Sequence, residues 1–78
     1  MKRHLALFRS TRAVIRAERL CGANGIRCRI IPVPRTISSE CGMAIEIDEN
    51  EIGSVTSLCS REAIEVEFAV WERQQAGS

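Results

Sequence analysis

The stretch GIRCRIIPVPRTISSECGMAIEID, from Gly25 to Asp48, decides the fold of this chain. It contains two runs in which apolar side chains alternate with charged or small ones. The apolar positions are Ile26, Cys28 and Ile30 in the first run, and Met43, Ile45 and Ile47 in the second. A period of two residues is typical of a β-strand with one covered face and one face toward solvent. Both runs are therefore predicted to be strands, joined by a long connection.

The sequence on either side of this stretch predicts the remaining elements. His4–Phe8 is a short apolar run and is predicted to be a strand. Ser10 or Thr11 is a good N-cap for a helix that should end near Gly22. Residues 48–62 predict a second helix, residues 63–71 a fourth strand, and residues 73–78 a flexible tail. The expected apolar positions of the second helix are Ile52, Val55, Leu58 and Cys59, and those of the fourth strand are Ile64, Val66, Phe68 and Val70.

The predicted element order is βαββαβ, in a single domain of residues 1–72. Because the strands alternate, both helices should cover the same face of one sheet. Two split βαβ units with right-handed crossovers then give an α+β ferredoxin-like sandwich, whose antiparallel sheet has the order 4-1-3-2. On the open face we expect Arg27 and Arg29 to lie opposite two acids of the third strand, Glu46 and Asp48. The open-face positions of strands one and three are predicted to be His4, Ala6, Ala44 and Glu46.

Charge and composition exclude several classes of function. The net charge of +1 argues against a nucleic-acid partner, which calls for a clear basic excess. RNA-recognition domains stack bases on aromatic residues of the central strands, and here Phe8 is the only possible platform. No apolar run approaches the roughly 18 residues of a membrane helix. The apolar part of the first ten residues is too short for a secretory signal. We therefore expect a cytoplasmic protein without a membrane partner.

The four cysteines are best considered one at a time. In the cytoplasm disulfides are rare, and with no CxxC pair in the sequence a metal site is poorly supported. We therefore predict neither a metal nor another cofactor. Cys21, Cys28 and Cys59 fall on apolar faces and are predicted to belong to the core. Cys41 is different, because it lies in the long connection between the second and third strands.

The predicted topology gives Cys41 a candidate environment. Strands one and two are parallel in this fold, so the start of the first helix and the connection after strand two meet at one edge of the sheet. Positive charge and a helix N-terminus both favour a thiolate, the nucleophilic form of cysteine. The candidate stabilising residues are Ser10, Thr11, Arg12, Arg35, Ser38, Ser39 and Gly42. A structural Cys41 in an ordinary turn is the alternative reading, since Ser, Gly and Pro are common in turns and the neighbouring Glu40 opposes a thiolate.

Two segments resemble a known family. LFRSTRAVIRAERLCGANGI and RIIPVPRTISSECGMAIEI, together covering about residues 5–48, are similar to the putative Se/S carrier protein-like family, a small bacterial family also described as a domain of unknown function. The specific part is PVPRTISSECGMAI, in which Cys41 matches the motif cysteine and Arg35, Ser38, Ser39 and Gly42 match its flanks. The family often has His after ST, where this chain has Arg12, so any thiolate here would depend more on fixed positive charge.

Two functions follow from these observations. In the first, Cys41 accepts sulfur or selenium as a persulfide or selenosulfide from a donor protein and passes it to an acceptor protein. Such a protein is a carrier more than a true enzyme, and the sequence shows no general acid–base pair. In the second, the chain is a non-catalytic module that binds an anion or a protein, with a structural Cys41. A homodimer, through the open sheet face or Trp71, is compatible with either function.

Overall fold

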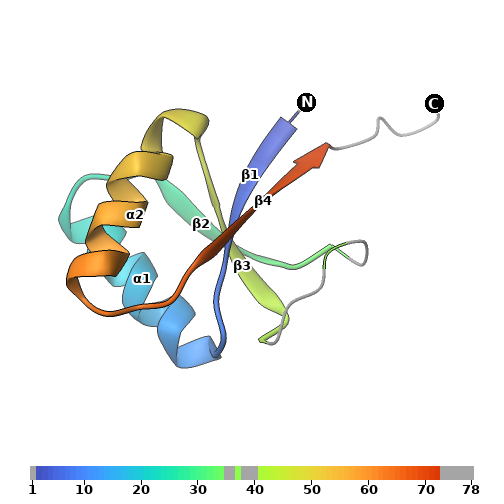
Figure 1. Cartoon of the computed structure of the whole chain (residues 1–78). Coiled ribbons are helices and arrows are strands. Elements are labelled where there is room, and N and C mark those ends of the chain that lie inside the picture. The colour runs from blue at the N-terminus through green and yellow to red at the C-terminus, as the bar shows by residue number, and fades with distance from the viewer. Residues whose placement is uncertain (1, 35–36, 38–40, 73–78) are drawn as a thin grey trace.

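A computed structural model describes residues 2–34, 37 and 41–72. Within these residues the elements follow one another in the predicted order (Figure 1). They are β1 (Lys2–Leu7), α1 (Thr11–Ala23), β2 (Cys28–Pro32), β3 (Met43–Ile47), the 3₁₀ turn η1 (Glu49–Glu51), α2 (Ile52–Arg61) and β4 (Glu67–Glu72). The predicted tail, residues 73–78, lies outside the described residues, as do Arg35, Ser38 and Ser39.

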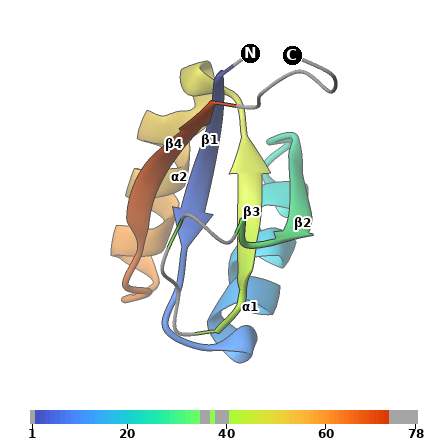
Figure 2. The same cartoon turned by 90° about the vertical axis from the view of Figure 1, so that its right-hand side faces the viewer.

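The strands form an antiparallel sheet in the order β2-β3-β1-β4, which is the predicted order. Both helices lie on one side of this sheet, and the connection between β2 and β3 leaves on the other side (Figures 1 and 2). The α+β ferredoxin-like fold is therefore confirmed. Its physical basis is the alternation of β2 and β3, which provides one apolar sheet face for the helices to cover.

Local sequence explains both ends of α1. Ser10 has an extended backbone, and its hydroxyl accepts a hydrogen bond from the backbone N–H of Ala13 at 3.2 Å, as expected of an N-cap. At the other end, Asn24 donates both its backbone N–H and its side-chain amide to the carbonyl of Leu20. Gly25 follows with a φ of +72°, a conformation that glycine adopts without strain. The chain then turns into β2.

The second helix differs from the prediction at its start. The backbone first forms η1, and α2 begins only at Ile52. Asp48 precedes the turn as the N-cap residue, but its side chain makes no capping hydrogen bond. The apolar side of the helix is as predicted, because Val55, Leu58 and Cys59 are all buried.

The core lies between the helices and the sheet. Its buried members are Ala6, Phe8, Val14, Ala17, Cys21, Ile26, Ile45, Ile47, Val55, Leu58, Cys59 and Ile64. Cys21 and Cys59 are each 2% exposed, and the half-buried Cys28 packs against this cluster, so all three predictions of core cysteines are confirmed. In contrast, Val70 is 57% exposed, because it pairs with His4 where β1 and β4 extend away from the helices (Figure 1).

The assignment of faces in β1 was wrong. Ala6 pairs with Ile45 and belongs to the core, so Ala6 and His4 lie on the helix side of β1. Leu5 takes the opposite face, where it pairs with Glu46. That face is also less wet than expected, since Leu5 and Ala44 are both 0% exposed. Leu5 and Ala44 belong to β1 and β3, the two central strands of the sheet.

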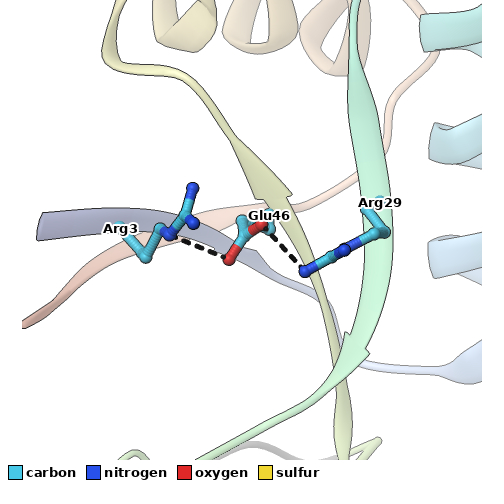
Figure 3. Close-up of polar contacts among 3 residues, drawn as sticks. All are labelled: Arg3, Arg29 and Glu46. Atoms are coloured by element: carbon cyan, nitrogen blue, oxygen red, sulfur yellow. Dashed lines mark hydrogen bonds and ion pairs between the residues drawn. The ribbon is translucent and has the colours of Figure 1, made fainter. Parts of the chain in front are cut away.

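Opposite charges meet across the strands of this second face. The register pairs Arg29 with Glu46, and an Arg29 nitrogen lies 3.5 Å from the Glu46 carboxylate, as predicted. The same carboxylate is 3.5 Å from Arg3 of β1, a partner that the sequence did not suggest (Figure 3). The expected partnership of Arg27 with Asp48 is absent from the ion pairs of the described residues. The reason is that the ladder between β2 and β3 ends at Cys28 and Ile47.

Candidate functional site

Cys41 lies two residues before β3, at the end of the connection from β2. Its side chain is half-buried and packs against the hydrophobic core beside the sheet. The thiol donates a hydrogen bond to the backbone carbonyl of Met43, with 3.1 Å between Sγ and the oxygen. Cys41 is therefore partly accessible, and its thiol is hydrogen-bonded to the first residue of β3.

Gly42 shapes the backbone beside this thiol. Its φ is +74°, in the left-handed region that residues with a Cβ rarely adopt. Its carbonyl accepts a hydrogen bond from the N–H of Val33, at 3.1 Å, which joins the two ends of the connection. A second bond, from the N–H of Ile37 to the carbonyl of Pro34, forms a turn further along. Cys41 consequently lies next to the hydrogen bond that joins the two ends of the connection.

The sheet register brings Cys41 to the same end of the molecule as the start of α1. Leu7, the last residue of β1, pairs with Ala44, so the residues before Ala44 and those after Leu7 lie at one edge (Figure 2). The predicted residues Ser10, Thr11 and Arg12 form the first turn of α1 and its cap at this edge. The structure thus places these three residues, Cys41 and Gly42 at one end of the sheet. The remaining predicted site residues, Arg35, Ser38 and Ser39, lie outside the described residues.

The start of α1 also borders a shallow groove of about 260 Å³ against the segment that leads into β4. The residues that line it are Arg9, Ser10, Arg12, Ala13, Arg16, Ala63, Ile64 and Glu65. Two of its arginines are already paired with acids. Arg9 lies 2.8 Å from Glu65, and Arg16 lies 3.3 Å from Glu62. These acids are far away in the sequence, so nothing in the local pattern could have assigned them to this edge.

The other cysteines have environments that disfavour the thiolate. Burial is the main cause in each case. It raises the pKa of Cys21 to about 12 and raises the pKa of Cys59. It also raises the pKa of Cys28, although a hydrogen bond from the Cys21 thiol acts in the opposite direction. These three thiols are therefore protonated near neutral pH.

In the ranges 2–34 and 41–72, no three His, Cys, Asp or Glu side chains are grouped so that they could hold a metal ion. Among these same residues no helix has the length and apolar character needed to span a membrane.

Comparison with known proteins assigns the chain to a family. The model of the family described as "Putative Se/S carrier protein-like" matches residues 3–70, which include β1, both helices, the connection and most of β4. No curated protein and no solved structure matches the chain. The match extends over far more than half of the sequence and includes the Cys41 segment. The chain therefore belongs to the putative Se/S carrier protein-like family.

Proposed function

We propose that this protein carries sulfur or selenium on Cys41. The observation that carries the proposal is the family match across residues 3–70, together with a half-buried Cys41 at the edge where α1 begins. The three other thiols support it by contrast, since Cys21 and Cys59 are 2% exposed and the pKa of Cys28 is raised by burial. A carrier requires one accessible thiol and a docking surface, and the chain needs no resident cofactor for this role.

The transfer step is an exchange at sulfur. The Cys41 thiolate attacks the terminal sulfur of a persulfide on the donor protein, and a new S–S bond forms on Cys41. The bond between the donor's two sulfurs breaks, and its electron pair leaves with the donor thiolate. With a terminal selenium atom the same exchange gives a selenosulfide. Reversal of the step on an acceptor protein's thiol completes the carrier cycle.

Specific residues are assigned to this step. The first turn of α1, with Ser10, Thr11 and Arg12, presents backbone N–H groups and a guanidinium that stabilise negative charge on the sulfur. Arg35, Ser38 and Ser39 complete the anion-stabilising set. Gly42 provides the backbone turn that holds Cys41 where the two ends of the connection meet. The hydrogen bond from the thiol to Met43 is given up in this step, because a thiolate has no proton to donate.

The test is loading of the purified protein. A cysteine desulfurase with L-cysteine serves as the sulfur donor, and a selenocysteine lyase with L-selenocysteine serves as the selenium donor. Digestion with a protease that cleaves after Glu isolates Cys41 in the peptide 41–46 and Cys59 in the peptide 52–62. We expect the mass of one added sulfur or selenium atom on peptide 41–46 alone, and none there in Cys41→Ser. Cys59→Ser is the matched control and should load like the wild type. Equal loading of all cysteines, or none on Cys41, contradicts the proposal.

A second function is favoured by the contacts of Cys41 itself. Its packing on the core and its bond to Met43 are those of a structural cysteine. The chain is then a non-catalytic module that binds an anion or a partner protein at the arginine-bearing edge. Cys41→Ser would leave such binding intact, whereas Arg12→Gln would weaken it. A carrier shows the opposite dependence, with sulfur transfer abolished by Cys41→Ser.

A further inference from the structure

A pair of thiols lies at the opposite end of the sheet from Cys41. Cys21 is in the last turns of α1 and Cys28 is the first residue of β2. The tight turn at Asn24 and Gly25 brings them together, and the N–H of Ile26 donates to the carbonyl of Cys21 at 2.8 Å. Cys28 packs against the buried cluster that contains Cys21, and the two thiols lie close enough to shift each other's pKa. The proposed carrier function does not use this pair.

The distance from Cys41 follows from the register. Cys28 pairs with Ile47, the last residue of β3, whereas Cys41 lies two residues before Met43, the first residue of β3. Six residues of extended chain span about 20 Å. The Cys21–Cys28 pair is therefore a separate location from the candidate carrier site.

Cys28 opens onto a groove of about 740 Å³ that carries charges of both signs. Its charged lining residues are Arg3, Arg19, Arg27, Arg29, Glu18, Glu46 and Asp48. Arg3 and Arg29 both pair with Glu46. Arg19 and Arg27 are exposed and take part in none of the ion pairs of the described residues, so they are available to carboxylates of a ligand. Glu18 and Asp48 offer the complementary charge for an ammonium group.

From this juxtaposition we propose that Cys21 and Cys28 form a redox-active dithiol that exchanges with a zwitterionic, low-molecular-weight peptide disulfide bound in the groove. The ligand class follows from the mixed lining, since such a molecule bears carboxylates and an ammonium group beside its S–S bond. Glutathione disulfide is the probe that matches this chemistry.

The reaction balances without any further reagent. The Cys28 thiolate, formed by release of its proton to solvent, attacks one sulfur of the probe and displaces one glutathione thiolate. The Cys21 thiol loses its proton and attacks the Cys28 sulfur, which displaces the second glutathione. The protein dithiol is oxidised by two electrons, and the probe is reduced to two thiols. Cys28 is the thiol that attacks the external disulfide, because Cys21 is only 2% exposed.

Burial affects the rate and the equilibrium differently. It raises the pKa of both thiols, so few thiolates are present near pH 7 and the exchange is slow. At equilibrium the same environment favours the disulfide, because no stabilised thiolate holds the pair in its reduced form. Incubation for several hours is therefore part of the experiment.

Proteolysis after Glu makes the outcome directly readable. The peptide 19–40 contains Cys21 and Cys28 and no other cysteine. The full chain carrying Cys41→Ser, which keeps the pair, is incubated with excess glutathione disulfide, quenched in acid, alkylated and digested. We expect peptide 19–40 to lose two hydrogens and to take up no alkyl group. In the additional variant Cys21→Ala we expect a glutathione adduct on Cys28, and in Cys28→Ala we expect no adduct on Cys21. Two free thiols in peptide 19–40 overturn the proposal.

The role of the groove has its own test. Arg19→Gln with Arg27→Gln should slow oxidation by glutathione disulfide by roughly two- to fivefold, as expected for exposed charge pairs. Oxidation by the uncharged bis(2-hydroxyethyl) disulfide should keep its wild-type rate. Equal slowing with both disulfides, or with neither, overturns the assignment of the groove to a charged ligand. Because these experiments use the Cys41→Ser variant, their failure says nothing against the carrier function, and failure of Cys41 loading says nothing against the dithiol.

Discussion

Replacement of Glu46 by Gln tests how burial sets the strength of an ion pair in this sheet. The Glu46 carboxylate lies between Arg3 of β1 and Arg29 of β2, so one side chain joins three strands (Figure 3). The Glu46 side chain is 14% exposed, whereas Arg3 is 34% and Arg29 is 72% exposed. Glutamine has nearly the same shape but no charge. The substitution therefore removes both attractions and leaves Arg3 partly buried without a counter-charge.

The magnitude follows from the exposure of these groups. Exposed ion pairs contribute about 0.2–1 kcal/mol each, and removing one partner costs more when the remaining charge is left partly desolvated. With two pairs on one carboxylate, we expect Glu46→Gln to lower the free energy of unfolding by about 1–2 kcal/mol. For a domain of this size each kcal/mol corresponds to a fall in Tm of about 4–8 °C. The whole stability of such a domain is on the order of 4–12 kcal/mol, so the loss is easily measured.

Urea unfolding followed by circular dichroism measures this change, with Glu65→Gln as the matched control. Glu65 lies closer to its arginine, at 2.8 Å against 3.5 Å, but both partners there are more than 70% exposed. We expect the control to change stability by no more than about 0.5 kcal/mol. If Glu65→Gln costs as much as Glu46→Gln, then distance and not burial ranks these pairs, and the reasoning is refuted.

Three further predictions concern the core, the Cys41 turn and the buried thiols. Ile45→Ala should lower the free energy of unfolding in urea by about 2–5 kcal/mol, because Ile45 is 0% exposed. Ile15→Ala, at a residue that is 41% exposed, should lower it by well under 1 kcal/mol. Similar losses in the two variants would show that Ile45 is not in the core. Gly42→Ala should destabilise the protein by about 1–2 kcal/mol, because the φ of Gly42 is +74°. Gly53→Ala, within α2, should stabilise it by up to about 1 kcal/mol. If thermal unfolding shows both variants changing stability in the same direction, the turn geometry is contradicted. Stability should also fall between pH 9 and about 12, because the pKa of Cys21 has its ordinary value of 9.0 in the unfolded chain and is raised by burial to about 12 in the folded protein. The contribution of this thiol to the free energy of unfolding is complete below pH 9 and is lost at up to about 1.4 kcal/mol per pH unit above it. Cys21→Ala should therefore flatten the slope of unfolding free energy against pH in this range. An unchanged slope would count against a buried thiol.

Local pattern was sufficient to predict the framework of this protein. The apolar side of α2 and the packing of Met43, Ile45 and Ile47 on the core depend on the local pattern, and both appear in the structure as predicted. The burial of Ala44 on the opposite face of β3 was not predicted. The N-cap at Ser10 depends on a hydroxyl and an N–H only three residues apart. The order of the strands then followed from chirality and from the need to cover one apolar face. The identity of Cys41 as the candidate residue came from the residues around it and their resemblance to a family.

What only the tertiary structure decided depends on residues far apart in the chain. The run His4–Phe8 is apolar on both sides, so its pattern could not show that Ala6, and not Leu5, faces the helices; the pairing with Ile45 settled this. The second arginine on Glu46 and the acid on Arg9 come from strands and loops brought together by folding. The contact between the Cys21 and Cys28 thiols likewise depends on how α1 docks beside β2. The sequence determines the charge and hydrophobicity of each side chain. Which distant side chains come into contact is decided only when the chain folds.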